Sequence, residues 1–338
     1  MSLKVVFVVR RDPETSSVER VFSIIGNRLR ERGIDVREQK LRFGNSLKGV
    51  IGNFFASRPA GFDIYHITGQ AHYYSLLLPR RKTVLTVHDL LVLNYRSSFR
   101  KYLVKKLFYD LPVRKARYIT VVSEYIKNEL VTATNCAEEK ITVIENPLTV
   151  GVEAHQRSFN VDCPRILHIG TALHKNLPNL IKALERIQCH LTIIGRVDAG
   201  IIKMLGANSI KFENRSGLSD EEILEEYRKT DIVSFCSLAE GFGLPIVEAQ
   251  ALSIPVITSD LSPMKDVAGD GAMLVDPYRP ECIRAGILRI INEENTRLDI
   301  VAKGRDNIER FRPEKIAAKY QQLYTEIATN KKRDHGGN

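Results

Sequence analysis

The sequence has no tryptophan and little cysteine, with five cysteines among 338 residues. The cysteines are scattered, no two form a C-x-x-C pair, and none stands with histidines at the spacing of metal ligands. These absences argue against a disulfide-stapled scaffold and against a zinc-binding module. They favour a reducing compartment.

A long hydrophobic run is also lacking. No apolar stretch approaches the roughly 18 to 20 residues that a bilayer-spanning helix needs. The opening residues MSLKVVFVVRRD are typical of a short strand followed by charge, and not of a secretory signal. We therefore expect a cytoplasmic protein.

What is present is the composition of a globular protein, 43% hydrophobic and 27% charged. The length exceeds that of most single cores, so two domains are expected. Short β-branched runs alternate with helical patterns, which predicts parallel strands joined by helices. The expected strands are LKVVFVVR, IDVREQKL, IYHI, KTVLTVH, YITVVS and ITVI, then RILHIG, LTIIG, IKFEN, DIVSFC, PVITS and AMLVD.

This alternation lapses after Pro147, through a stretch without a clean period, and the domain boundary is placed there. Two α/β domains in tandem predict that the carboxyl ends of two parallel sheets face a shared cleft, where such sheets bind ligands. The expected parts are an N-terminal domain over 1–150, a C-terminal domain over 151–312, a helix over 313–330 and a disordered tail over 331–338.

The formal charge of +10 is concentrated, because residues 96–117 hold eight Lys or Arg against Asp110 alone. Aromatic and leucine side chains are interleaved with these bases. One interpretation is a solvated helix face. A second is a helix in the interface of an anionic membrane, which would hold the protein peripherally on the inner face of the cell membrane. Nucleic acid is the third.

The most informative stretch is SLAEGFGLPIVEAQALSIPVI, residues 237–257. Glu240 leaves an expected strand, and Gly241 and Gly243 let the backbone turn and approach a ligand. Pro245 stands where a first helical turn would begin. The amide groups of that helix start suit a diphosphate. Glu240 and Glu248 then supply carboxylates on either side, and carboxylates accept hydrogen bonds from sugar hydroxyls.

This stretch resembles the E-x7-E signature of retaining glycosyltransferases of the GT-B fold, family 4 (group 1) in particular. In that family the first Glu and the glycine amides hold the transferred sugar, and the second Glu binds the nucleotide ribose. The resemblance implies a donor site made here of Glu240, Gly241, Phe242, Gly243, Leu244, Pro245 and Glu248.

A second stretch, RILHIGTALHKNLPNLIKAL, is similar to the family's G-x-x-x-x-K-N loop, in which a cation neutralises the leaving diphosphate. Lys175 is expected in that role. Many members carry an arginine beside the lysine or after the glycine, where this chain has His174 and Thr171. Arg196 is a substitute for that second cation or else a surface residue. The implied donor-binding residues here are Gly170, Thr171, Lys175, Asn176 and Arg196.

Weaker fits, such as LSDEEILEEY before DIVSFC, extend the resemblance over most of the chain. The N-terminal domain matches more loosely, because the first strand is followed by Arg10 and Arg11 and not by a Gly-Gly loop. The two arginines contact phosphates or an anionic acceptor, or else form a plain charged loop. His88 is expected to contact the donor sugar or the acceptor, with His66 and His72 as competitors and a core position as the alternative for each.

The resemblance implies two Rossmann-like domains facing a central cleft, with a C-terminal helix packing back towards the acceptor-binding N-terminal domain. The implied activity is hexosyl transfer with retention, from a UDP-, GDP- or ADP-sugar to a glycan or lipid-linked acceptor, with no cofactor and no metal. Glu240, Lys175 and His88 are the expected catalytic residues. An epimerase, a sugar synthase and a non-catalytic nucleotide or nucleic-acid binder are the alternatives.

Overall fold

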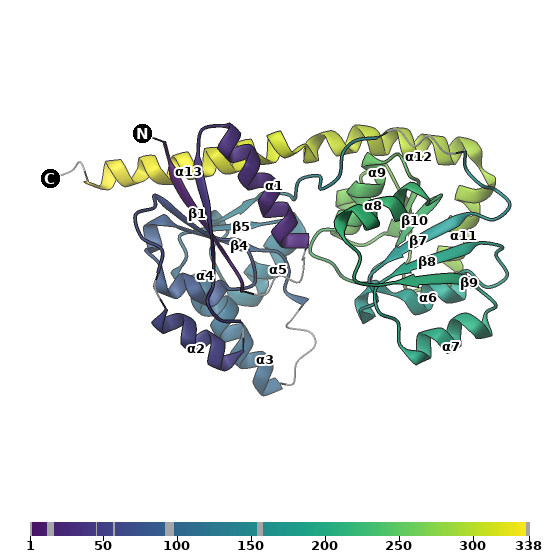
Figure 1. Ribbon diagram of the computed structural model, residues 1–338, viewed down its shortest axis with the longest axis horizontal. Coiled ribbons are helices and arrows are strands. Elements are labelled where there is room, and N and C mark those ends of the chain that lie inside the picture. The colour runs from purple at the N-terminus through teal and green to yellow at the C-terminus, as the bar shows by residue number, and fades with distance from the viewer. Residues whose placement is uncertain are drawn as a thin grey trace. The chain divides into compact units, whose positions relative to one another are not determined.

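The computed structural model describes residues 2–11, 17–44, 46–56, 58–91, 98–153 and 158–335. The chain divides into two compact units. Unit 1 comprises Met1–Pro147 with Arg312–Asn338, and unit 2 comprises Leu148–Phe311 (Figure 1). The first passage between units therefore follows Pro147, where the alternation of strands and helices lapses.

Unit 1 is built on a parallel sheet of strand order β2-β1-β3-β4-β5-β6. Each of these strands is one of the β-branched runs expected in the first half. The run along β4 is buried throughout, as a strand covered on both faces by helices should be. The strands are β1 (Lys4–Val9), β2 (Asp35–Lys40), β3 (Ile64–Ile67), β4 (Thr83–Val87), β5 (Tyr118–Val121) and β6 (Ile141–Val143).

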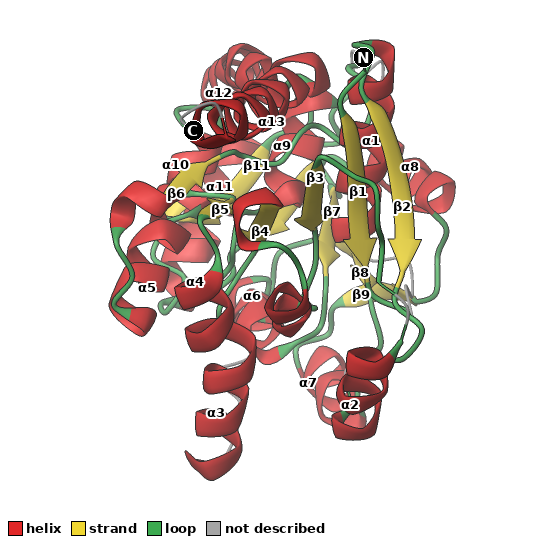
Figure 2. Ribbon diagram, turned by 90° about the vertical axis from the view of Figure 1, so that its left-hand side faces the viewer, coloured by secondary structure: helices red, strands yellow, loops and turns green. Residues whose placement is uncertain are grey.

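Helices pack around this sheet, and Figure 2 shows the strands between them. The Ser123 side chain caps α5 by accepting a hydrogen bond from the Ile126 amide at 3.2 Å. The α-helices of unit 1 are α1 (Ser17–Glu31), α2 (Leu47–Phe55), α3 (Ser98–Lys105), α4 (Leu111–Lys115), α5 (Glu124–Thr134) and α13 (Pro313–His335).

The last helix, α13, packs against the core of unit 1. The Tyr324 hydroxyl lies 2.6 Å from His66 Nδ1, and the Tyr320 ring meets Phe22 of α1 edge to face. The expectation that the C-terminal helix packs back on the N-terminal domain is therefore confirmed. The helix runs on to His335, beyond the expected end at 330, because no glycine or proline interrupts it before Gly336. Residues 336–338 lie outside the described part.

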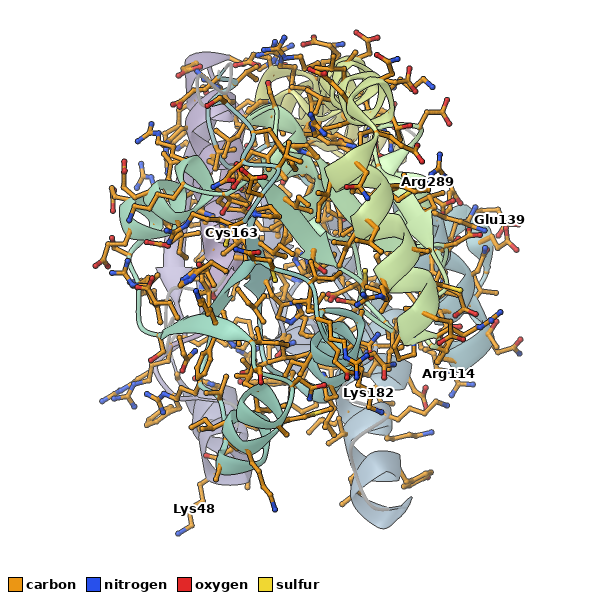
Figure 3. All side chains as sticks on the ribbon, turned by 90° about the vertical axis from the view of Figure 1, so that its right-hand side faces the viewer. Lys48, Arg114, Glu139, Cys163, Lys182 and Arg289 are labelled. Atoms are coloured by element: carbon orange, nitrogen blue, oxygen red, sulfur yellow. The ribbon has the colours of Figure 1, made fainter. Side chains whose placement is uncertain are left out.

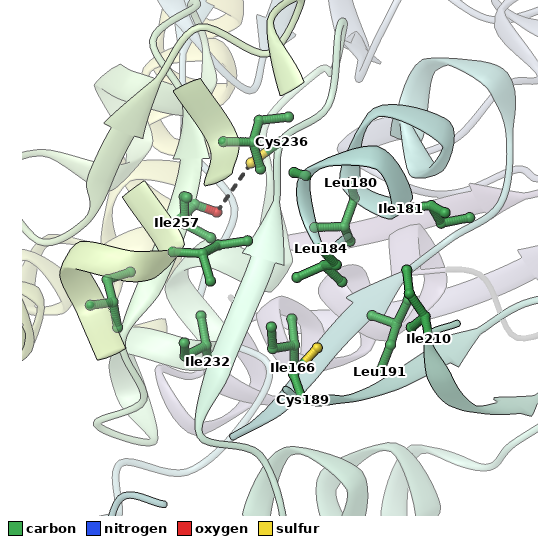
Figure 4. Close-up of a cluster of buried hydrophobic side chains, with 14 of the residues drawn as sticks. Ile166, Leu180, Ile181, Leu184, Cys189, Leu191, Ile210, Ile232, Cys236 and Ile257 are labelled. Atoms are coloured by element: carbon green, nitrogen blue, oxygen red, sulfur yellow. Dashed lines mark hydrogen bonds between the residues drawn. The ribbon is translucent and has the colours of Figure 1, made fainter. Parts of the chain in front are cut away.

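Unit 2 has a second parallel sheet, of order β12-β11-β10-β7-β8-β9. Its buried cluster of Leu, Ile and Val side chains is shown in part in Figure 4, where Ile166, Ile232 and Ile257 come from neighbouring strands. The strands are β7 (Arg165–Ile169), β8 (His190–Ile194), β9 (Lys211–Arg215), β10 (Ile232–Phe235), β11 (Val256–Ser259) and β12 (Met273–Val275).

The strand order of unit 2 reverses between β7 and β10, since the chain builds outward from β7 to β9 and then returns to place β10 on the other side of β7. Loops that leave the carboxyl ends of strands at such a switch point form the usual binding crevice of open α/β sheets. The two loops that leave β7 and β10 carry the two stretches singled out in the sequence. The α-helices are α6 (Leu177–Ala183), α7 (Ala199–Ala207), α8 (Asp220–Arg228), α9 (Leu244–Ala251), α10 (Met264–Ala268), α11 (Pro280–Asn292) and α12 (Glu294–Asn307).

Candidate functional site

The loop after β10 turns directly into α9. Gly243 is the N-cap residue of α9 and has φ +117°, a value that side chains disfavour. Pro245 lies in the first helical turn, as expected. Phe242 was assigned to the sugar, but its side chain is buried against Phe311 with ring centroids 5.6 Å apart. Only the backbone of Phe242 therefore remains for a ligand.

Lys175 and Glu240 meet at the switch point. Lys175 Nζ donates to Glu240 Oε1 at 2.7 Å, and the two side chains are 20% and 11% exposed. The ammonium group also lies 4.7 Å from the centroid of the Phe235 ring. These contacts hold a cation and a hydrogen-bond acceptor side by side, in surroundings that screen charge less than bulk water does.

Gly170 makes this arrangement possible. It has φ +96°, and a Cβ there would lie 2.9–3.1 Å from three carbon atoms of the Lys175 side chain. The lysine stem therefore crosses the space that any other residue would fill. This contact gives a physical reason for a glycine five residues before the lysine in this loop.

The loop after β7 is tied to its neighbours by Asn176. This residue is buried, and its side-chain amide donates to Cys236 O at 3.0 Å and to Pro277 O at 2.7 Å. The Leu238 amide donates in turn to His174 O at 2.7 Å. Asn176 holds the loops after β7, β10 and β12 together. Its predicted contact with the donor stays a prediction.

Thr171 and Arg196 mark the outer side of the site. The Thr171 side chain packs against the backbone of Gly195, at the end of β8. Arg196 follows that glycine and is exposed. The structure thus brings Arg196 to the loop adjoining Thr171, and its role as the second cation stays a prediction.

Glu248 lies one turn inside α9 and is 3% exposed. Its Oε2 accepts from the Tyr227 hydroxyl at 2.7 Å, and its Oε1 accepts from the Thr149 hydroxyl. Sequence reasoning missed both partners. Tyr227 closes the LSDEEILEEY stretch, whereas Thr149 stands in the segment without a pattern, so only Tyr227 had a signal. The hydroxyl groups of Tyr227 and Thr149 thus orient the Glu248 carboxylate by donating hydrogen bonds to both of its oxygens.

His88 lies at the carboxyl end of β4 in unit 1 and is partly exposed. Its Nε2 donates to Thr68 O at 2.8 Å, which leaves Nδ1 as the acceptor nitrogen of the neutral ring. Burial lowers the pKa of His88, although the Thr68 carbonyl and the acids Asp89 and Glu19 act in the opposite direction. The neutral ring can therefore accept a proton or a hydroxyl hydrogen bond at neutral pH.

The two competing histidines are core residues. His66 is fully buried between the Tyr324 hydroxyl and the Thr86 hydroxyl, each at 2.6 Å. His72 is buried with its ring nitrogens 2.9 Å from Phe108 O and 3.2 Å from Thr86 O. Since each ring nitrogen faces a protein partner, neither histidine is placed to bind a substrate.

Acid should destabilise unit 1 through His66. Burial lowers the pKa of His66 to about 3, so between that value and the unfolded value of about 6.5 the unfolded chain binds the extra proton. Stability is full above pH 6.5 and is lost as pH falls towards 3, by on the order of 2 kcal/mol at pH 5. Urea unfolding at pH 7 and pH 5 measures this loss. Burial also lowers the pKa of His72, to about 4, so His66→Phe should lessen the pH slope without abolishing it. An unchanged slope would contradict the assignment.

Arg10 follows β1 and pairs with Glu19 in the first turn of α1, with Arg10 Nε 3.1 Å from Glu19 Oε1. The glycine-free loop of this chain thus brings an arginine to the carboxyl edge of the unit 1 sheet. Residues 12–16 lie outside the described ranges. Within the described ranges, no three His, Cys, Asp or Glu side chains are grouped so as to hold a metal ion.

Two family models match the chain. "Glycosyltransferase Family 4" matches residues 3–150, and "Glycosyl transferases group 1" matches residues 153–307. The first match covers the N-terminal part of unit 1, and the second covers nearly all of unit 2.

Two relatives named as mannosyltransferases share low sequence identity with this chain. The O-antigen chain mannosyltransferase RfbU of Salmonella typhimurium is 26% identical over 215 residues, which are 61% of this chain and 59% of that protein. The MMP alpha-(1->4)-mannosyltransferase of Mycolicibacterium hassiacum is 28% identical over 300 residues, 80% of this chain and 72% of the relative. The match thus spans less than two thirds of the length of the Salmonella protein.

Solved structures share the whole architecture. Sucrose-phosphate synthase from Thermosynechococcus elongatus has a TM-score of 0.77 at 17% identity, over 97% of this chain and 100% of that chain. Anabaena HepE in complex with UDP and glucose has a TM-score of 0.74 at 16% identity, over 96% and 100%. Structural matches at such low identity show a shared fold, and the two family models show the family. The chain belongs to the group 1, family 4 glycosyltransferases, with the two-domain α/β GT-B fold.

Proposed function

We propose that the chain transfers a hexose from a nucleoside-diphosphate sugar to a glycan or lipid-linked acceptor, with retention of configuration and without a metal. The observation that carries this proposal is the Lys175–Glu240 pair, 2.7 Å apart at the switch point of unit 2. Three residues after Glu240, Gly243 is the N-cap residue of α9, and Glu248 lies one turn inside that helix. A cation, a helix start and two carboxylates match the needs of a diphosphate between two polyols.

In the proposed reaction the bond from the anomeric carbon to the diphosphate oxygen breaks. The bond from that carbon to the acceptor oxygen forms on the same face. The acceptor proton passes to the leaving phosphate, so no protein nucleophile is needed. Lys175 offsets the negative charge that grows on the diphosphate, and Glu240 orients the sugar through its hydroxyls.

Glu248 is proposed to bind the ribose, and His88 to contact the donor sugar or the acceptor through Nδ1. Two features support a mannose- or glucose-type donor. Two relatives are named as mannosyltransferases, and HepE was solved with UDP-glucose. A cytoplasmic protein held peripherally at the inner face of the cell membrane by 96–117 would meet a lipid-linked acceptor.

A thermal-shift screen against UDP-, GDP- and ADP-sugars and the free nucleotides tests the donor site. We expect a rise in Tm with one nucleotide family, because a ligand that binds only the folded state stabilises it. Glu248→Ala should abolish that rise when each variant is compared with its own ligand-free Tm. Glu221→Ala, an exposed acid on α8, is the matched control and should keep the rise. No rise with any nucleotide would contradict the proposal.

Product analysis separates the alternatives. An epimerase changes the sugar of its donor without an acceptor, and a sugar synthase uses a small free sugar or sugar phosphate as acceptor. A non-catalytic nucleic-acid binder would show salt-sensitive binding to DNA or RNA and no response to sugar nucleotides. The Lys175–Glu240 pair favours the transferase over that binder, because a phosphate-backbone site has no use for the acid.

A further inference from the structure

The whole net charge of the chain comes from two segments of unit 1. Residues 41–60 contain three Lys or Arg and no Asp or Glu, and residues 96–117 contain eight against Asp110. The remaining 39 basic and 39 acidic residues of the chain cancel. A local excess of this size marks the part of the surface that attracts an anionic partner.

The first segment holds α2, which exposes apolar side chains. Phe55 is 87% exposed and Ile51 is 52% exposed. With the exposed Lys48 they follow the i, i+3, i+7 spacing, so the three form one stripe along the helix. Figure 3 shows Lys48 projecting from the lower end of unit 1. This stripe does not contribute to the core of unit 1, because the opposite face of α2 packs against that core.

The second segment holds α3 and the π-helical turn Lys106–Asp110 that continues it. Tyr102 is 60% exposed and Leu103 is 49% exposed. Lys105 and Lys106 follow and are partly exposed. Arg96 lies outside the described residues, and the side chains of Arg100 and Lys101 are not described. In Figures 1 and 2, α2 and α3 both lie at the lower end of unit 1.

A row of three aromatic side chains, centred on the buried Tyr73, connects the two helical segments. Phe54 of α2 stacks on Tyr73 at 6.3 Å between centroids, and Tyr73 meets Phe108 edge to face at 5.3 Å. Asn53 of α2 also donates to the Tyr73 hydroxyl at 2.8 Å. Because Tyr73 is fully buried, this row sets where α2 lies relative to the Lys106–Asp110 turn.

We propose that α2 and α3 together form a docking surface for an anionic phospholipid bilayer. Ile51, Phe55, Tyr102 and Leu103 enter the interface between headgroups and acyl chains, and the lysines contact lipid phosphates. No helix among the described residues is long and apolar enough to cross a bilayer, so this surface is peripheral. The second helix, α2, adds Ile51 and Phe55 to the apolar anchoring that Tyr102 and Leu103 of the basic segment provide. Membrane binding of this kind does not depend on sugar transfer.

Apolar character distinguishes a membrane from nucleic acid as the partner. A nucleic acid binds basic side chains through its phosphates and stacks its bases on aromatic rings, but burial of the exposed Ile51 and Leu103 contributes nothing to such binding. A bilayer interface takes up both kinds of side chain. Two projecting helices at one end of a unit also suit a flat surface that is wide enough to meet both.

Vesicle sedimentation of the full chain tests the proposal. We expect binding to vesicles of phosphatidylcholine with about one third phosphatidylglycerol, and little binding to pure phosphatidylcholine. Ile51→Ser with Phe55→Ser should weaken binding about tenfold or more. Lys105→Glu with Lys106→Glu should weaken it and reduce its salt dependence. All four positions are at least partly exposed, and circular dichroism checks that each variant folds.

The matched control is Ile202→Ser with Leu298→Ser, two side chains of unit 2 that are 51% and 58% exposed. It should bind vesicles as the unaltered chain does. Equal binding by the Ile51/Phe55 double variant would overturn the proposal. So would binding of the unaltered chain to RNA or DNA without binding to anionic vesicles. Loss of donor binding in the thermal-shift screen would refute the proposed transferase and leave this result untouched.

Discussion

Lys175→Ala should lower kcat by about 10²- to 10³-fold, the usual loss when one preorganised group facing developing charge is removed. Lys175 is the cation that contacts Glu240, and its stem is seated over Gly170. The measurement is release of nucleoside diphosphate, with the donor that the thermal-shift screen identifies.

Lys182→Ala is the matched control, because Lys182 lies on α6 and is exposed (Figure 3). It should keep nearly the full rate. Glu240→Gln should also lower kcat, and the Lys175/Glu240 double variant should lose less than the product of the two single losses, because the residues are in contact. A Lys175→Ala enzyme with the unaltered rate would remove this lysine from the proposed mechanism.

Gly271→Ala should destabilise unit 2 by about 3 kcal/mol, at the upper end of the usual cost of overpacking. A Cβ at Gly271 would lie 2.4 Å from Gly304 Cα and 2.6 Å from Gly304 N. Gly304 belongs to α12, so helix backbone, together with Gln250 Nε2 at 2.6 Å, blocks the new atom. In a unit of this size we expect Tm to fall by about 6–12 °C.

The same contact bears on the donor site. Gln250 of α9 donates from Nε2 to Gly271 O at 3.1 Å, and α9 also carries Glu248. Nucleotide binding should therefore weaken as α12 is displaced. Gly206→Ala in α7 is the control: a Cβ there meets nothing within 4 Å, so it should stabilise by about 0.5–1 kcal/mol. Equal Tm values for the two variants would contradict this account.

Much of the architecture could be predicted from the sequence. The expected strand runs all form strands, and the LSDEEILEEY stretch forms α8, whose N-cap Ser219 makes a capping box with Glu222. The short α10, and α11 and α12 near the C-terminus, were not predicted. The apolar residues of α12 show little helical periodicity, so the sequence pattern did not reveal this helix. Contacts with α9 and α11 hold it in place, because packing can stabilise a helix that has no marked apolar stripe.

The donor loops were predictable to the level of residue type. A glycine-rich turn before Pro245 and a Gly170 five residues before Lys175 are local patterns that a reader of the sequence can interpret. Two side chains of these loops make contacts that the local pattern did not predict. Phe242 packs against Phe311, and Asn176 links neighbouring loops through its side-chain amide. Both changes depend on residues far away in the sequence.

By itself, the sequence determined the two α/β units, the boundary after Pro147, and the loops that carry the candidate donor residues, because strand and helix periodicity and turn chemistry are local. Only the tertiary structure decided which groups meet. It paired Lys175 with Glu240, placed Tyr227 and Thr149 on Glu248, and buried His66 while leaving His88 partly exposed. Such contacts depend on strand order and packing, which set distances between residues that a one-dimensional pattern does not contain.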